Sequence, residues 1–170
     1  DQCPLLPVMQ LGIHALDLVH YLLGPIATIA GHAHNVLAPS GVVDAVSATF
    51  ELAGGEMGAM ISNYCTQVTF EYRVAGTEGS IRCTPHRLWY RSTAATDGRG
   101  EGPAEEHDFG AHERESYMLQ MEAFGRAVRE GTVPEVDGRA GLQALAVVEA
   151  LDEAVRTRTC VAVVPVANTR

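Results

Sequence analysis

Residues 11–25 read LGIHALDLVHYLLGP, and their spacing predicts a helix over residues 11–23. Apolar side chains recur along one face of this helix, at Leu16, Val19, Leu22 and Leu23. Gly24 suits the left-handed position that follows many helices, and Pro25 cannot continue a helix. The helix is therefore expected to end at residue 23.

A second face of the same helix is polar. Gln10, His14, Asp17 and Tyr21 recur near the 3.6-residue period, so we expect their side chains to lie on one side. Histidine titrates near neutral pH, which makes His14 a candidate general acid or base. Asp17, one turn further on, would orient the ring or hold substrate hydroxyls. The residues alone leave open a second interpretation, in which His14 is a structural histidine beside a surface aspartate.

Beyond this helix, short runs rich in β-branched residues alternate with tight turns. Gly54-Gly55 and the GTEG of residues 76–79 are typical of hairpins. The runs predict strands over residues 26–37, 42–52, 56–65, 70–75, 80–83, 87–92 and 159–164. Because hairpins connect most of them, we expect an open, mainly antiparallel sheet rather than βαβ units.

Two long helices are predicted in the second half of the chain. The first spans residues 113–130 and ends at Gly131, and the second spans residues 138–158 after Asp137 as its N-cap. Their expected core-facing side chains are Tyr117, Met121, Phe124 and Val128 in the first, and Leu142, Leu145, Val148, Leu151 and Val155 in the second. The fold class is thus α+β, with helices on one face of the sheet. The other face is left bare, which is typical of a surface that meets another domain or subunit.

The composition excludes several classes of function. The chain has 170 residues and a net charge of −9, which argues against nucleic acid and anionic membranes as partners. No apolar run reaches the roughly 18 residues that span a bilayer. All 12 basic residues are arginine, so lysine chemistry is excluded within this chain.

No metal or dinucleotide site is expected within the chain. The cysteines Cys3, Cys65, Cys83 and Cys160 show no C-x-x-C pair, and free thiols in a cytoplasmic protein are the simpler interpretation. His32 and His34 share one side of a predicted strand but lack an obvious third ligand, and His107 and His112 fall in a predicted loop. The loop over residues 93–106 contains Gly98-Arg99-Gly100, but no strand leads tightly into it. Arg82, Arg87, Trp89 and Tyr90 are expected on a sheet surface, with an interface as the alternative.

Residues 7–24, PVMQLGIHALDLVHYLLG, resemble the start of the C-terminal domain of the glucose–fructose oxidoreductase, inositol dehydrogenase and rhizopine-catabolism (MocA) family. That family's motif has the form D-x-G-x-H-x-x-D, and Gly12, His14 and Asp17 match it in register. The resemblance continues through residues 43–50, 74–80 and 134–142, and it covers nearly the whole chain.

The resemblance implies an NAD(P)-dependent oxidoreductase that acts on a sugar, inositol or related polyol by hydride transfer in the cytoplasm. Residues 1–170 would form its C-terminal substrate-binding and oligomerisation domain. The N-terminal Rossmann domain, absent from this chain, would bind NAD or NADP, so the chain alone is expected to be inactive. His14 matches the family's catalytic histidine, Gln10 and Asp17 would contact substrate, and the open sheet face would form a homo-oligomer.

Two departures from the family pattern bear on activity. The aspartate expected four residues before the histidine is Gln10, which cannot take a proton but can still hydrogen-bond a hydroxyl. The family's glycine-rich fingerprint and its catalytic lysine belong to the Rossmann half, and neither is in this chain, which has no lysine. These departures keep an alternative open: a non-catalytic binding or dimerisation module with the same fold.

Overall fold

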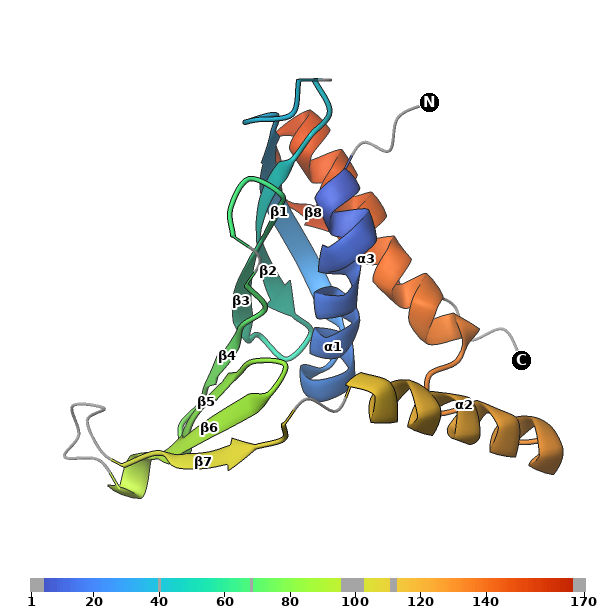
Figure 1. The fold of residues 1–170 in the computed structure, drawn as a ribbon. Coiled ribbons are helices and arrows are strands. Elements are labelled where there is room, and N and C mark those ends of the chain that lie inside the picture. Colours follow the sequence, from blue (N-terminus) through green and yellow to red (C-terminus); the bar gives the residue numbers. More distant parts are fainter. Residues whose placement is uncertain (1–4, 40, 68, 96–102, 111–112, 167–170) are drawn as a thin grey trace. The chain divides into compact units, whose positions relative to one another are not determined.

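The computed structural model describes residues 5–39, 41–67, 69–95, 103–110 and 113–166 (Figure 1). The chain divides into two compact units, Asp1–Gln67 with Glu135–Arg170 and, between them in sequence, Val68–Pro134. The α+β class and the antiparallel pairing are confirmed. The strands divide between two four-stranded sheets, with orders β3-β2-β1-β8 and β4-β5-β6-β7.

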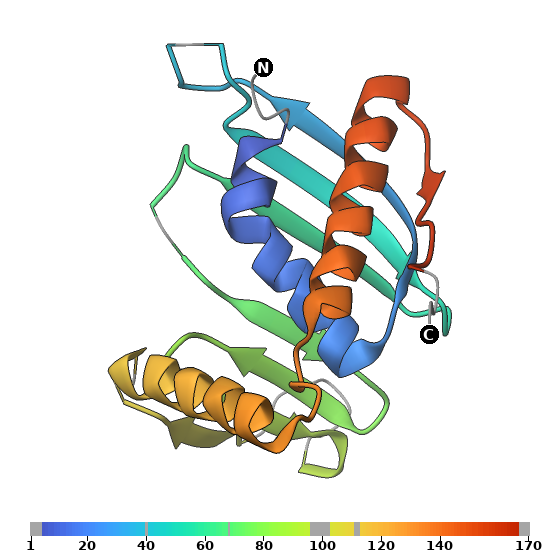
Figure 2. The same cartoon turned by 90° about the vertical axis from the view of Figure 1, so that its right-hand side faces the viewer.

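The first unit is a sheet covered by helices on one face (Figure 2). Its helices are η1 (Val8–Gly12), α1 (Ile13–Leu23) and α3 (Gly138–Thr157), and its strands are β1 (Ile26–His34), β2 (Ala45–Leu52), β3 (Met57–Asn63) and β8 (Val161–Ala162). Strand β2 alternates strictly between buried and exposed residues. Its buried residues pack with those of the helices in a core centred on Leu16, Ile29, Val46, Val147 and Leu151.

Close packing of α3 on the sheet depends on a glycine in β1. A Cβ atom at Gly31 would lie 2.6 Å from Cδ1 of Leu151 and 2.7 Å from the backbone oxygen of Ser47. Leu151 is fully buried at this contact. Helix α3 thus packs closely on β1, and it also contacts α1.

The ends of the predicted helices are largely confirmed. Gly24 and Gly131 adopt positive φ angles of 103° and 65° after α1 and α2. The Asp137 carboxylate accepts hydrogen bonds from the N–H groups of Arg139 and Ala140, as expected of an N-cap. The predicted apolar stripes hold only in part, because Leu22, Leu23 and Leu142 are 59%, 45% and 55% exposed.

The second unit contains the other sheet and one helix. Its elements are β4 (Tyr72–Ala75), β5 (Gly79–Cys83), β6 (Arg87–Ser92), η2 (Thr93–Ala95), β7 (Glu105–Asp108) and α2 (Glu113–Glu130). Helix α2 forms where predicted, but the expectation that Tyr117, Met121, Phe124 and Val128 face a core is wrong. These four side chains are between 56% and 69% exposed. Helical periodicity identifies an apolar face but does not say what covers it.

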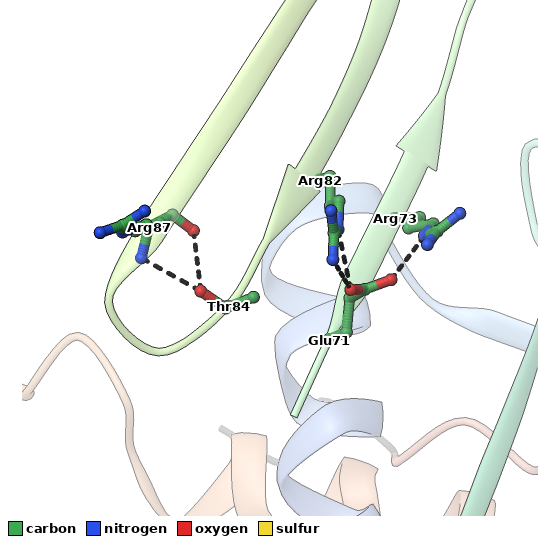
Figure 3. Close-up of polar contacts among 5 residues, drawn as sticks. All are labelled: Glu71, Arg73, Arg82, Thr84 and Arg87. Carbon is green, nitrogen blue, oxygen red and sulfur yellow. Dashed lines mark hydrogen bonds and ion pairs between the residues drawn. The ribbon is translucent and has the colours of Figure 1, made fainter. Parts of the chain in front are cut away.

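Charged side chains line one face of this second sheet (Figure 3). The Glu71 carboxylate binds Nε of Arg73 at 2.6 Å and Nη2 of Arg82 at 2.6 Å, and Arg82 lies over the Trp89 ring at 4.9 Å. The bonds from Arg82 and then Arg73 lower the pKa of Glu71. Exposed ion pairs of this kind contribute little to stability. Arg82, Arg87, Trp89 and Tyr90 lie on the strands of this sheet, as expected, and an interface at them stays a prediction.

The assignment of residues 93–106 to a loop is wrong at its end, and so is the loop assignment of His107. Glu105–Asp108 forms β7, which pairs antiparallel with β6. The sequence EEHD has little strand propensity. Its pairing is supported by the long-range ion pairs from Arg87 to Glu106 at 3.1 Å and to Asp108 at 3.4 Å. His112 and residues 96–102, which include Gly98 and Gly100, lie outside the described residues.

Candidate functional site

The polar face of α1 begins with a turn of unusual geometry. Residues Val8–Gly12 form a π-helix, in which the Ile13 N–H donates to the carbonyl of Val8. Turns of this type inside helices are frequent at functional sites. The turn is fastened to β3, because the buried Ser62 hydroxyl donates to the Pro7 carbonyl at 2.9 Å. Gly12 permits this approach, since a Cβ atom there would lie 2.8 Å from Cε of Met60.

Three of the four predicted face residues line one cavity. His14, Asp17 and Tyr21 lie on its wall with other residues of α1 and with the segment that enters α3. The cavity has a volume of about 680 Å³, within the range of small-molecule sites. Its lining comprises His14, Asp17, Leu18, His20, Tyr21, Pro25, Glu135, Val136, Ala140 and Gln143. The spacing argument is therefore confirmed for these three side chains.

Glu135 closes the far side of this cavity and was not singled out from the sequence. Its Oε1 accepts a hydrogen bond of 2.7 Å from the Tyr21 hydroxyl, across 114 residues of sequence. This bond, with the charge of Glu135, raises the pKa of Tyr21. The only sequence signal was its place in the family-like stretch 134–142, which did not indicate a contact with α1.

His20 also lines the cavity and was passed over in the sequence. Its Nε2 accepts the N–H of Ile26 at 3.1 Å, so the ring fastens the end of α1 to the start of β1. Burial lowers the pKa of His20, and nearby Asp17 opposes that effect. The other ring nitrogen, Nδ1, is buried and has no hydrogen-bond partner among the residues that the structure describes. A neutral ring that accepts at Nε2 carries its proton at Nδ1.

Gln10 is separate from the cavity lining and has a partner of its own. The Tyr64 hydroxyl donates to Oε1 of Gln10 at 2.6 Å. Tyr64 follows β3 and its side chain is half-exposed. The phenol takes one of the two acceptor sites of the amide oxygen, and the amide nitrogen of Gln10 carries two N–H donors. The structure thus places Gln10 beside Tyr64, a residue that sequence reasoning missed.

Asp44 organises the loop beside Tyr64. Its carboxylate accepts the N–H groups of Val36, Leu37 and Ala38 at 2.7, 2.8 and 2.7 Å. Burial alone would raise its pKa, but the three hydrogen bonds outweigh burial and lower the pKa to about 2. This loop ends β1 at His34, three residues earlier than predicted.

The remaining histidines and cysteines do not gather into a site in the described part of the chain. His32 and His34 are exposed on β1, opposite Ser47 and Ala45 of β2. No three His, Cys, Asp or Glu side chains among the described residues are placed to hold a metal ion. Cys65, Cys83 and Cys160 are free thiols. None of the described helices has the length and apolarity to cross a membrane.

Comparison with known proteins agrees with this arrangement. Residues 2–163 match the family model described as "Oxidoreductase family, C-terminal alpha/beta domain". The chain is 28% identical over 159 residues to D-xylose 1-dehydrogenase (NADP(+)) 2 of Haloferax volcanii. The aligned region covers 91% of this chain and 47% of that protein. It is 31% identical over 148 residues to inositol 2-dehydrogenase of Rhizobium meliloti, and this alignment covers 81% of this chain and 44% of that protein.

The fold has solved counterparts as well. Levoglucosan dehydrogenase, solved in complex with NADH and levoglucosan, superposes with a TM-score of 0.81 at 17% identity over 92% of this chain and 50% of that one. At 17% sequence identity, this similarity shows that the two chains share a fold and nothing more. The chain spans about half the length of the curated relatives that it matches, at 47% and 44%.

Proposed function

The chain belongs to the glucose–fructose oxidoreductase, inositol dehydrogenase and MocA oxidoreductase family, and from this premise we propose that it is the substrate-binding and oligomerisation domain of an NAD(P)-dependent dehydrogenase. The substrate is a sugar, inositol or related polyol. One observation carries the proposal: His14, Asp17 and Tyr21 line a cavity of about 680 Å³ together with Glu135. Carboxylates and an imidazole beside apolar walls suit a molecule with many hydroxyl groups.

The cofactor belongs to another part of the whole protein in this proposal. Dinucleotides bind where a parallel strand meets a helix through a glycine-rich turn, whereas both sheets described here are antiparallel. We therefore assign no described residue to NAD or NADP, and we place the cofactor in an N-terminal Rossmann domain that precedes this chain. When bound there, it supplies the acceptor for the substrate hydride.

This chain's own contribution to the reaction is to bind the substrate and to accept a proton. The carbon that loses hydride carries a hydroxyl whose proton must leave, and His14 is the base suited to take it. Asp17 lies one turn further along the same cavity wall and accepts hydrogen bonds from other hydroxyls. Gln10, which lies outside the cavity lining and accepts from Tyr64, would contact a substrate through its amide N–H groups.

Oligomerisation is assigned to the uncovered face of the first sheet. Its exposed residues include Ser47 and Thr49 in the middle and the apolar Met57 and Ile61 on β3, which are 86% and 77% exposed. A second copy packed on this face would cover them. The free thiols of the chain are in keeping with a cytoplasmic location, which we also propose.

The proposal is tested with the full-length protein that contains this chain. Reduction of NAD or NADP in the presence of xylose, glucose or inositol is followed at 340 nm. We expect His14→Ala to lower turnover about 10²- to 10⁴-fold, the usual weight of general acid–base catalysis. His107→Ala, which changes an exposed histidine of β7, is the matched control and should leave turnover unchanged. Equal turnover of the His14 variant and the wild type would remove His14 from the mechanism.

The second candidate is a non-catalytic binding module of the same fold. The observation in its favour is Gln10, which cannot take a proton and is held by Tyr64. The same experiment separates the two functions. A wild-type protein that binds polyols yet reduces neither cofactor with any of them is a binding module.

A further inference from the structure

The cavity contains an acidic group that proton transfer at His14 does not use. Glu135 and Asp17 are both in its wall, and among the described residues that line it none is arginine. His20 does not offset these charges, because burial lowers its pKa and so favours its neutral form. The fixed charges of the wall are therefore negative.

Tyr21 holds the Glu135 carboxylate in place. The phenol donates to Oε1 at 2.7 Å, and it stays protonated at neutral pH because the bond to Glu135 raises its pKa. An ionised carboxylate has acceptor sites on both oxygens and no donor. With one site filled by Tyr21, the others remain to accept from hydroxyl groups, and such charge-assisted hydrogen bonds are short and strong.

The distance from His14 suits contact with a single ligand. His14 and Tyr21 are seven residues apart on α1, which is about 10 Å along the helix axis. Between them, Leu18 lines the wall beside the polar Asp17 and His20, and the apolar Val136 and Ala140 line the same cavity. A monosaccharide or cyclitol with its reacting carbon near His14 would place C–H groups against these apolar side chains and its remaining hydroxyls toward Glu135.

We infer that Glu135, held by Tyr21, is a specificity-determining residue that selects uncharged sugars and cyclitols over sugars bearing a carboxylate or phosphate. It binds the former through hydroxyl donors and repels the latter through its charge. The nature of the ligand rests on the proposed function, whereas the role of Glu135 in choosing between neutral and anionic ligands does not depend on turnover. Specificity of this kind combines an attractive contact with a repulsive one.

The test measures binding by calorimetry on the full-length protein, separately from cofactor reduction. D-Glucose, D-xylose and myo-inositol serve as neutral probes, and D-glucuronate, which has the glucose ring with a carboxylate at C6, serves as the anionic probe. We expect Glu135→Gln to weaken the best neutral probe about tenfold or more, by loss of a charge-assisted acceptor. It should also raise the affinity for glucuronate relative to glucose about tenfold or more. Tyr21→Phe should weaken the neutral probe in the same direction.

The matched control is Glu149→Gln, which removes the same charge from an exposed position on α3 outside the cavity and should leave both affinities unchanged. A Glu135→Gln variant with wild-type affinity and a wild-type preference for glucose over glucuronate overturns the inference, and so does a wild-type protein that binds no neutral probe. Altered preference in the variant of a protein that reduces no cofactor supports the role of Glu135 and refutes the dehydrogenase. A wild-type protein that reduces the cofactor, with a Glu135→Gln variant that keeps the preference for glucose over glucuronate, supports the dehydrogenase and refutes the role of Glu135.

Discussion

Replacing Gly31 by alanine tests whether α3 is positioned by its contact with β1. The new Cβ atom would lie 2.6 Å from Cδ1 of Leu151 and 2.7 Å from the carbonyl oxygen of Ser47. The leucine methyl can rotate away, but Ser47 is on the neighbouring strand, next to the Ala48 that pairs with Gly31. Its oxygen can move only if the pairing of β1 and β2 is disturbed. The clash is therefore with backbone and cannot be relieved by a rotamer change.

The magnitude follows from two opposed effects. Overpacking of a tight core costs about 1–3 kcal/mol. Alanine also restricts the unfolded chain relative to glycine, which offsets about 0.4–1 kcal/mol of that cost. We expect a net loss of about 1–2 kcal/mol for Gly31→Ala, or about 2–8 °C in Tm for a protein of this size.

A second glycine provides the matched control. Gly141 lies within α3, and a Cβ atom there meets nothing within 4 Å. Gly141→Ala should stabilise the protein by about 0.5–1 kcal/mol through helix propensity. Thermal and urea unfolding followed by far-ultraviolet circular dichroism should thus move in opposite directions for the two variants. A Gly31→Ala protein as stable as the wild type would refute the close approach of Leu151 and Ser47 to Gly31.

Two further predictions concern the loop after β1 and the open sheet face. Asp44→Asn should lower the free energy of unfolding at neutral pH. Because the pKa of Asp44 is lowered to about 2, its carboxylate stabilises the wild type above the ordinary aspartate pKa, and this stabilisation is lost as the pH falls toward 2. Urea titrations should therefore give the two proteins the same free energy of unfolding near pH 2. Ile61→Arg should lower the mass measured by sedimentation if the open face joins copies. Leu142→Arg, which also replaces an exposed apolar side chain but on α3, should leave the mass unchanged. Unaltered assembly in the Ile61 variant would exclude that face.

Local signals predicted much of the fold. Gly24, Gly131 and Asp137 act within a few residues of the helix ends that they mark, so each end could be located from the sequence. Strand β7 could not, because its charged sequence has little strand propensity and pairs with β6, about 20 residues earlier in the chain, where Arg87 supplies its ion pairs. The exposure of α2 was also beyond prediction, since an apolar stripe carries no information on its partner.

The residues of the candidate site likewise divide into those that the sequence predicted and those that it did not. His14, Asp17 and Tyr21 share a helix face, and periodicity alone placed them together. Glu135 and Tyr64 reach the site through folding of distant segments, 114 residues from Tyr21 and 54 residues from Gln10. Neither belongs to a pattern with a fixed period, so no spacing argument indicates them.

The bond between Tyr64 and Gln10 also limits what position 10 can contribute to catalysis. A glutamine exchanges no proton at neutral pH, so position 10 offers a substrate only amide hydrogen bonds, from its two N–H donors and from an oxygen that already accepts one bond from Tyr64. Among the described residues that line the cavity, the hydroxyl proton would then pass to His14 or to a carboxylate, Asp17 or Glu135. Donors at position 10 favour an oxygen that gains negative charge as its proton leaves, since they are better matched to the developing anion than to the neutral hydroxyl. Gln10 is thus compatible with catalysis if His14 is the base, and the loss of turnover in His14→Ala is the observation on which that compatibility depends.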